Sequence, residues 1–172
     1  MEPVVREAAL GDAAQIAEIH VATWKHAYRY LVPRSALDSL SVEERVKDWK
    51  KRLQATTRIT YVLELEGSIV GWASVGPARD EDQKGNAGEL YAIYMAPSFI
   101  GRRLGQVLFA HCESELQKDR YPIVTVWVLE ANLGARRFYQ KAGFQPDGAT
   151  KSVLIGGASL AELRYSKRLP VP

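Results

Sequence analysis

The sequence predicts a single α/β domain built around a mixed sheet. Its apolar residues switch between a helical spacing of about 3.6 and the alternation of a strand, in the order β-α-α-β-β-β-α-β-α-β-β. Neither an internal repeat nor a long linker divides the 172 residues, which is an ordinary length for one domain. With 47% apolar and 25% charged residues, the composition is that of a soluble globular protein.

The first third of the chain is expected to form one strand and two helices. A short strand is predicted at residues 4–8. Asp12 is placed to cap the first helix and Ser41 the second, because each is followed three residues later by Gln or Glu, as in a capping box. Pro33 is expected to end the first helical region.

The middle of the chain changes to strand periodicity. Residues 59–66 and 69–76 are rich in β-branched and aromatic side chains around a Glu-Gly-Ser turn, which predicts a hairpin, and residues 89–95 predict a third strand. Strict alternation in that third strand gives two faces. One face is expected to carry Glu89, Tyr91, Ile93 and Met95, and the other Leu90, Ala92 and Tyr94.

The last part alternates helices and strands. The continuous apolar run at residues 123–129 is typical of a strand buried on both faces. A helix is expected to begin at Asn132 and to stop at Gly143. The other predicted elements are a helix at residues 103–119 and two strands at 144–154 and 160–168.

The charge distribution argues against a nucleic-acid binder. The net charge is +3, the sequence pI is about 9.0, and both signs are interleaved along most of the chain. The dense basic sites are the pairs Arg102–Arg103 and Arg136–Arg137, which suit a ligand with several phosphates better than a long polyanion. No run approaches a membrane span or a signal peptide, so the expected partners include no membrane and the expected location is the cytoplasm.

Two further kinds of site are not expected. The single cysteine cannot form an internal disulfide, and no Cys/His cluster has metal-ligand spacing, so no metal is expected. Cys112 follows His111 directly, which suggests a nucleophile beside a base. Because neighbouring helical positions point about 100° apart, core packing is the preferred interpretation of this pair.

The segment at residues 89–108, ELYAIYMAPSFIGRRLGQVL, is a candidate pyrophosphate cradle. A strand that runs through a glycine turn into a helix presents free backbone N–H groups and the positive end of a helix to an anion. Arg102 and Arg103 add fixed charge at the same place. An ordinary strand-to-helix connection remains the alternative for this segment taken alone.

The segment at residues 132–144, NLGARRFYQKAGF, is more specific. It resembles the cofactor-binding helix of the GNAT superfamily of N-acetyltransferases, and it follows a buried strand as that pattern requires. The matching positions are Asn132, Ala135, Phe138, Tyr139, Lys141, Gly143 and Phe144. The same family's turn matches less well: Ile100 stands where Gln or Arg is usual and Arg103 where the first glycine is usual, while Gly105 keeps the final glycine.

The resemblance implies one N-acetyltransferase domain over residues 1–172, with a mostly antiparallel sheet whose middle strands splay apart. It implies acceptor-side helices at about 12–54 and an acetyl-CoA-binding region at about 88–144. Acetyl-CoA would be a co-substrate, without a metal. Its pantetheine would lie along Ile93, Tyr94 and Met95, with Asn132 beside it. Its phosphates would meet the turn of Ile100, Gly101, Arg102, Arg103, Leu104, Gly105 and Gln106, and further out Arg136 or Arg137.

The resemblance also implies catalytic residues. An alkyl ammonium must lose a proton before it can attack a thioester. Glu89, on the strand before the turn, matches the family's general base, with a water chain or a merely exposed carboxylate as alternatives. Tyr139 matches the tyrosine that protonates the departing thiolate, with aromatic packing as its alternative.

The acceptor is the least determined part of the prediction. Trp24, Tyr28 and Tyr30 are expected either to line an acceptor pocket or to fill the core edge of a helix. The acidic stretch 80–82 could attract a polyamine or could simply be solvated. A small-molecule primary amine is the preferred acceptor over a peptide or protein amine. A non-catalytic CoA-binding module and a protein-interaction domain stay open, as does a homodimer.

Overall fold

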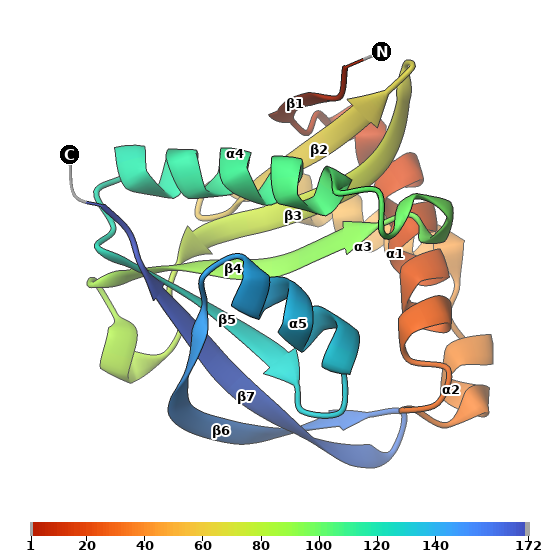
Figure 1. The fold of residues 1–172 in the computed structure, drawn as a ribbon. Coiled ribbons are helices and arrows are strands. Elements are labelled where there is room, and N and C mark those ends of the chain that lie inside the picture. Colours follow the sequence, from red (N-terminus) through yellow and green to blue (C-terminus); the bar gives the residue numbers. More distant parts are fainter. Residues whose placement is uncertain (1, 171–172) are drawn as a thin grey trace.

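A computed structural model describes residues 2–170 as a seven-stranded sheet with helices on both faces (Figure 1). The strand order is β1-β2-β3-β4-β5-β7-β6, and every neighbouring pair is antiparallel except β4 and β5. This arrangement confirms the predicted α/β class. The strands are β1 (Val4–Glu7), β2 (Ile59–Leu65), β3 (Ser68–Pro77), β4 (Ala87–Met95), β5 (Ile123–Leu129), β6 (Gln145–Ile155) and β7 (Ala158–Arg168).

The helices divide between the two faces of the sheet. One face packs against α1 and α3, and the other against α4 and α5 (Figure 1). The α-helices are α1 (Ala13–Ala27), α2 (Arg34–Asp38), α3 (Val42–Leu53), α4 (Leu104–Lys118) and α5 (Leu133–Lys141). Single 3₁₀ turns are η1 (Leu10–Asp12), η2 (Glu81–Gln83) and η3 (Pro97–Phe99). Within the described residues, no helix is long and apolar enough to cross a bilayer.

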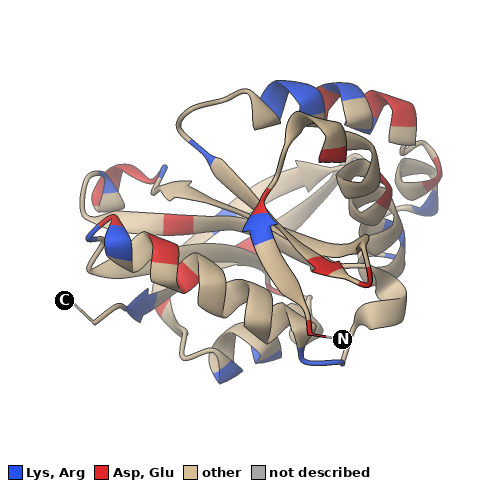
Figure 2. Cartoon of the chain, turned by 90° about the horizontal axis from the view of Figure 1, so that it is seen from above, with Lys and Arg blue, Asp and Glu red and all other residues tan. Residues whose placement is uncertain are grey.

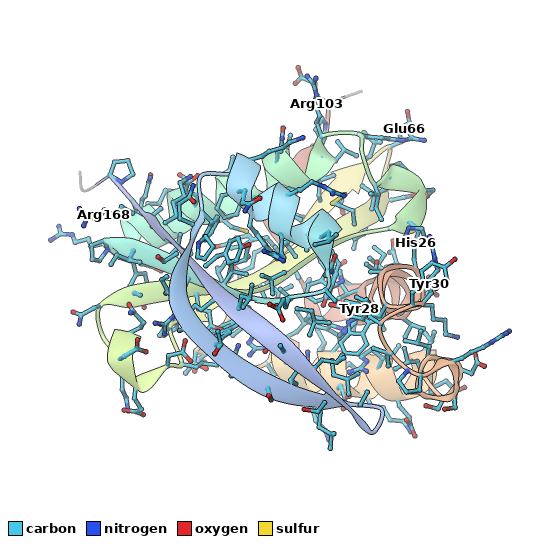
Figure 3. The ribbon with its side chains drawn as sticks, turned by 60° about the horizontal axis from the view of Figure 1, so that its bottom comes forward. His26, Tyr28, Tyr30, Glu66, Arg103 and Arg168 are labelled. Atoms are coloured by element: carbon cyan, nitrogen blue, oxygen red, sulfur yellow. The ribbon has the colours of Figure 1, made fainter. Side chains whose placement is uncertain are left out.

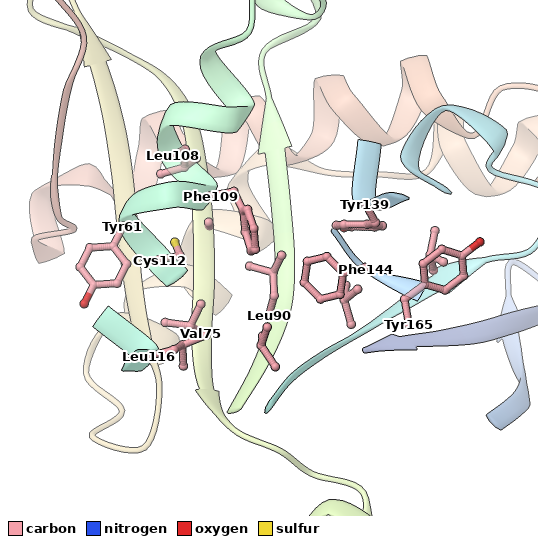
Figure 4. Packing of buried hydrophobic residues seen from close by; sticks show 14 of the residues in the cluster. Tyr61, Val75, Leu90, Leu108, Phe109, Cys112, Leu116, Tyr139, Phe144 and Tyr165 are labelled. Atoms are coloured by element: carbon pink, nitrogen blue, oxygen red, sulfur yellow. The ribbon is translucent and has the colours of Figure 1, made fainter. Parts of the chain in front are cut away.

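Three apolar clusters stabilise these layers. The largest lies between the sheet and α4 and α5, where Phe109, Tyr139 and Phe144 pack around Leu90 (Figure 4). A second joins α1 and α3 to β2 and β3. The third, smaller cluster lies between the α1–α2 region and the β6–β7 hairpin, and it includes Tyr28, Val32, Leu37 and Leu129.

The sheet opens in its middle. β4 and β5 are paired only at Ala87–Glu89 and Ile123–Thr125, next to the start of each strand. Beyond these residues the two strands diverge, so the β5-facing edge of β4 has no partner strand over its C-terminal half. An unpaired strand edge offers backbone N–H and C=O groups to a ligand.

A β-bulge changes the expected faces of β4. Val75 pairs with Leu90 and Ser74 pairs with Ala92, so Tyr91 is the extra residue. Leu90 therefore shares the α4 side with Ile93 and Met95, while Ala92 and Tyr94 face α1 and α3. The predicted grouping of Glu89 with Ile93 and Met95 is wrong, because the bulge shifts the alternation by one residue.

The helix starts agree only in part with the predicted caps. Ser41 caps α3, and its Oγ accepts a hydrogen bond from the N–H of Glu44 at 3.3 Å. Asp12 does not cap α1: its carboxylate accepts the N–H of Ala9 at 2.7 Å and the guanidinium of Arg6. The short helix α2 begins after Pro33 and was not predicted.

Candidate active site

The divergence of β4 and β5 leaves one large cleft of about 1420 Å³. It runs from the start of α4, past β4 and α5, to the third apolar cluster beside α2. Its cationic side chains at the α4–α5 end are Arg103, Arg137 and Lys141. Among the described residues that line the cleft, Glu162 on β7 is the single carboxylate.

The turn before α4 is shaped by two residues with positive φ. Gly101 has φ 83° and Arg103 has φ 63°, and Arg103 stands directly before the first residue of α4. The left-handed conformation explains why glycine is the usual residue at this position, and an L-residue there costs about 1 kcal/mol or more. The turn keeps the glycine-type backbone although the sequence has lost the glycine.

Gly105 allows α4 to approach α5 closely at this end of the cleft. A Cβ on Gly105 would lie 3.3 Å from the ring of Phe138 and 3.7 Å from Cγ of Met95. The first turn of α4 and its free N–H groups can therefore sit beside β4 and α5.

Most of the predicted cofactor residues come together in this cleft. The following line it: Ile93, Tyr94, Met95, Ile100, Gly101, Arg103, Gly105, Gln106, Asn132 and Tyr139. Asn132 also caps α5, since its Oδ1 accepts the N–H of Ala135 at 3.1 Å. The side-chain amide nitrogen of Asn132 is thereby held in a fixed orientation.

Three predicted cofactor residues are not part of the lining. Arg136 donates from Nε to the hydroxyl of Tyr165 at 3.0 Å and from Nη1 to the carbonyl of Glu130 at 2.9 Å, so its guanidinium is engaged in the fold. Arg102 lies over the ring of Phe99, 4.9 Å from its centroid. Leu104 packs against the large core cluster. Arg137 lines the cleft where Arg136 does not, because one helical position turns a side chain by about 100°.

Tyr139 on α5 is one of the residues that line the cleft. Its side chain is 6% exposed, and its ring packs edge-on against Phe138 and Phe144. Burial, followed by the nearby phenol of Tyr94, raises the pKa of Tyr139 well above its usual value. The phenol therefore keeps its proton at physiological pH and is available as a donor.

Aromatic residues at the C-terminal end of α1 contact Tyr94 on β4. Trp24 and Tyr28 line the cleft, and both bond to the hydroxyl of Tyr94, from Trp24 Nε1 at 3.2 Å and from the Tyr28 hydroxyl at 3.4 Å. Figure 3 shows Tyr28 and Tyr30 near the end of α1, with Arg103 far from them at the start of α4. Tyr30 is 86% exposed and does not line the cleft.

The structure places Glu89 outside the cleft lining. It is 1% exposed and lies in the part of β4 that pairs with β5. Its carboxylate accepts the backbone N–H of Arg79 at 3.0 Å and the guanidinium of the same residue at 2.5 Å. The role of Glu89 as the general base stays a prediction.

The acidic stretch near η2 is engaged in the fold. Asp80 accepts hydrogen bonds from Trp127 Nε1 at 2.9 Å and from Arg164 at 3.0 Å. Asp82 accepts two more from Arg164, and Asp147 accepts one. These carboxylates thus face a buried guanidinium rather than the cleft.

His111 and Cys112 belong to the core and its edge. Cys112 is fully buried, and this burial raises the pKa of its thiol to about 12. The ring of His111 packs edge-on against Tyr61. A nucleophile–base pair is not formed here, in agreement with the preferred interpretation.

Several residues of the cleft lining were not predicted from the sequence, among them Trp127 and Glu162. Trp127 on β5 and Glu162 on β7 both line the cleft, on the face that looks toward α1 and α2. The alternation within each strand gives which residues share a face. It cannot show that this face closes a cavity with a helix more than a hundred residues earlier in the chain.

Comparison with known proteins places this geometry in a family. The model of the acetyltransferase (GNAT) family matches residues 16–144. A relative from Bacillus subtilis (strain 168), named as the uncharacterised N-acetyltransferase YuaI, is 35% identical over 160 residues, which are 92% of this chain and 89% of the relative.

Solved structures share the fold. The PaiA N-acetyltransferase from Thermoplasma acidophilum in complex with coenzyme A superposes with a TM-score of 0.76 at 17% identity, over 98% of this chain and 99% of the other. The putative acetyltransferase yncA from Salmonella typhimurium, with acetyl-CoA, gives a TM-score of 0.74 at 20% identity, over 100% of this chain and 96% of the other. The chain belongs to the GNAT family of acetyltransferases.

Proposed function

We propose that this protein transfers an acetyl group from acetyl-CoA to a primary amine of a small molecule, by direct attack in a ternary complex. The observation that carries the proposal is that a single cleft joins a cationic end to an aromatic, carboxylate-bearing end, with the protonated Tyr139 between them. A polyanionic donor and a cationic acceptor could thus be held in one cleft with their reacting groups in contact.

The cationic end supplies partners for a pyrophosphate. Arg103 and Arg137 can pair with phosphate oxygens, and the first N–H groups of α4 add the positive end of the helix. The unpaired edge of β4 from Ile93 to Met95 can pair with the amides of a pantetheine arm as a neighbouring strand would. The relatives solved with coenzyme A and acetyl-CoA support this assignment.

The reaction requires hydrogen-bond donors that stabilise the oxyanion and an acid that protonates the departing thiolate. Backbone N–H groups on the free edge of β4 near Tyr94 and Met95 can stabilise the oxyanion that forms when an amine adds to the thioester. Tyr139 then donates its hydroxyl proton to the departing sulfur. A phenol is protonated near neutral pH, and burial raises the pKa of Tyr139 further, so the proton is in place when the sulfur departs.

The proton acceptor for the amine is assigned to a carboxylate or to water connected with one. Glu89 is the residue expected from the family resemblance, and it would act through water because Arg79 covers its oxygens. Glu89→Gln should then change the pH dependence of kcat/KM. An unaltered profile would assign the proton to another group.

One experiment separates the candidate functions. Calorimetry with acetyl-CoA asks whether the cofactor binds, and thiol release over a panel of amines asks whether it turns over. Binding with amine-dependent release supports the transferase. Binding without release by any small amine or peptide supports the non-catalytic CoA-binding module, and absence of binding overturns both CoA-dependent functions.

A further inference from the structure

Glu162 supplies the carboxylate of the described cleft lining, and it has few partners within the fold. Its side chain is only 19% exposed, and its one ion pair is to Lys151 Nζ at 3.6 Å, which is longer than a hydrogen bond. Within residues 2–170, its carboxylate accepts no hydrogen bond from another side chain or from the backbone. A carboxylate has about four acceptor positions, so acceptor positions of Glu162 remain available to a ligand.

Glu162 lines the same cleft as Tyr28, Tyr94 and Tyr139. Its charge contributes to the raised pKa of Tyr28, after burial and the nearby Tyr94 and Tyr139 phenols. It also contributes to the raised pKa of Tyr94, for which burial is the main cause. Glu162 therefore lines the same cleft as Tyr28 and Tyr94 and acts on their hydroxyl groups through its charge, although it comes from the other side of the opened sheet.

A cation already occupies the neighbourhood of this carboxylate. Lys151 on β6 is directly opposite Glu162 on β7, and its Nζ lies 4.0 Å from the centroid of the Trp127 ring. An aromatic face beside a carboxylate is a favourable environment for an ammonium group. The other charged group at this end of the cleft, Arg29, is turned to His26 and to the ring of Tyr30.

The space next to Glu162 has apolar walls. Leu129 is the partner of Glu162 across the β5–β7 ladder, so both side chains are on the same face of the sheet. We name this part of the cleft the acceptor chamber. Its walls are Val32, Leu37, Leu40, Leu129, Val153 and Ile155, all of which line the cleft and belong to the third apolar cluster.

These observations rest on the proposed transferase function and narrow its substrate. We infer that Glu162 binds the reactive ammonium group of the acceptor, and that the acceptor is a monocationic amine whose apolar body fills the acceptor chamber. A polyamine would bring a second ammonium for which the lining described here holds no second carboxylate, because Asp80 and Asp82 pair with Arg164. A peptide would leave its amide groups unpaired against apolar walls.

The test compares three amines as acceptors, and it compares two variants that are expected to change the KM for 2-phenylethylamine in opposite directions. The probes are 2-phenylethylamine, spermidine and a tripeptide with a free α-amino group, each with acetyl-CoA. The wild type should give its highest kcat/KM with 2-phenylethylamine. Glu162→Gln should raise the KM for 2-phenylethylamine about tenfold or more, as expected for loss of a hydrogen bond to a charged group. Lys151→Gln should lower that KM, because it removes a competing ammonium.

A readout that does not depend on turnover separates this inference from the proposed function. Calorimetry of 2-phenylethylamine into the CoA-loaded protein should show binding that Glu162→Gln weakens and Lys151→Gln strengthens, while the affinity for acetyl-CoA stays the same in both variants. Binding of this kind without acetyl transfer would overturn the proposed transferase function and would support the amine-binding site. Preferential acetylation of spermidine or of the tripeptide, or an unchanged 2-phenylethylamine affinity in Glu162→Gln, would overturn the inference and leave the transferase standing.

Discussion

Tyr139 shows how one side chain can serve both packing and chemistry. Its ring belongs to the large core cluster and packs against Phe138 and Phe144, and the same residue lines the cleft. Figure 4 shows Tyr139 beside Phe144 in this cluster. Aromatic packing and proton donation, the two interpretations of Tyr139 from the sequence, are therefore compatible with each other. A substitution that keeps the ring and removes the hydroxyl separates them.

Tyr139→Phe should reduce kcat by about a hundredfold or more, the usual contribution of a positioned acid, because the departing sulfur loses its proton donor. The affinity for acetyl-CoA, measured by calorimetry, should remain near that of the wild type, since Phe keeps the ring contacts. Turnover equal to that of the wild type would remove Tyr139 as the acid.

Arg103 combines an unfavourable backbone with a favourable charge. Arg103→Ala and Arg103→Gly should both weaken acetyl-CoA binding, and the loss should shrink at high salt because phosphate contacts are screened. The glycine variant should be more stable than the alanine variant by about 0.5 to 1 kcal/mol, since glycine adopts φ 63° without steric cost. Urea denaturation gives the difference in stability, and equal affinity of wild type and both variants for acetyl-CoA would exclude a phosphate contact.

At the scale of elements, the β6–β7 hairpin closes the acceptor chamber by touching α2. Gly156 at its tip has φ 57°, and a Cβ there would overlap the Cβ of Ala36. The next residue, Gly157, has φ 83°, and a Cβ on it would meet no atom within 4 Å. The two glycines therefore form a matched pair with similar backbone strain and different contacts.

Gly156→Ala should push the hairpin tip away from α2 and raise the KM for the acceptor amine, with the affinity for acetyl-CoA retained. It should also cost about 1 to 3 kcal/mol more stability than Gly157→Ala, as expected for overpacking. Gly157→Ala is the control, because it carries the strain of positive φ without the collision. Equal KM values in the two variants would show that contact between the hairpin and α2 does not shape the chamber.

In the described part of the chain, basic and acidic residues are mixed over the molecule. Lys, Arg, Asp and Glu are interleaved over the helices and loops in the view of Figure 2. Inside the cleft, the cations Arg103, Arg137 and Lys141 lie at one end, and the carboxylate of Glu162 lies at the other end together with Arg29. This internal arrangement suits a small anionic donor and a small cationic acceptor better than a macromolecular polyanion.

The stability of the whole fold should fall on mild acidification because of His20. Burial, with smaller contributions from Arg45 and Arg52, lowers the pKa of His20 to about 3. Its Nδ1 accepts the indole N–H of Trp49 at 3.1 Å. The unfolded chain takes up a proton near pH 6.5 and the folded chain does not, so the stabilisation is present above that pH and is lost as the pH falls toward about 3.

Urea denaturation should therefore give a free energy of unfolding about 2 kcal/mol lower at pH 5 than at pH 7.5. His20→Gln removes the titrating group and should lose most of this difference. The carboxylates whose pKa is lowered, Asp12 and Asp82, contribute only at more acidic pH, because their ordinary value is 3.8. A variant that keeps the full pH dependence would assign it to another group.

Local patterns in the sequence determined most of the fold. Alternation and helical spacing are properties of neighbouring residues, so they placed every strand and the helices α3, α4 and α5 close to their observed bounds. The helix α1 ends at Ala27, before the predicted limit at Pro33. Ser41 could be identified as a cap because a cap bonds within its own turn, and the predicted helix start at Asn132 coincides with the cap of α5. The five-residue helix α2 was missed, since so short an element has no periodicity to detect.

The residues of the candidate site also fall into those that the sequence predicts and those that tertiary contacts decide. The cofactor end is built from two contiguous segments, the turn before α4 and the helix α5, so residues such as Gly101, Gly105, Asn132 and Tyr139 could be named from the sequence. The orientation of β4 could not, because the bulge at Tyr91 arises from its pairing with β3. Whether Arg136 or Arg137 faced the cleft depended on the partner of each guanidinium, Tyr165 in the case of Arg136.

The acceptor end was decided by the tertiary structure alone. Glu162 is an ordinary strand residue in the sequence and becomes the one acidic side chain of the described lining only when β7 lies opposite α1 and α2. Asp80 and Asp82 look available in the sequence, and the structure pairs them with Arg164 on β7. The sequence by itself thus determined the fold and the family, because those depend on local pattern and contiguous motifs. Contacts between residues far apart in the chain decided which charges remain available to a substrate.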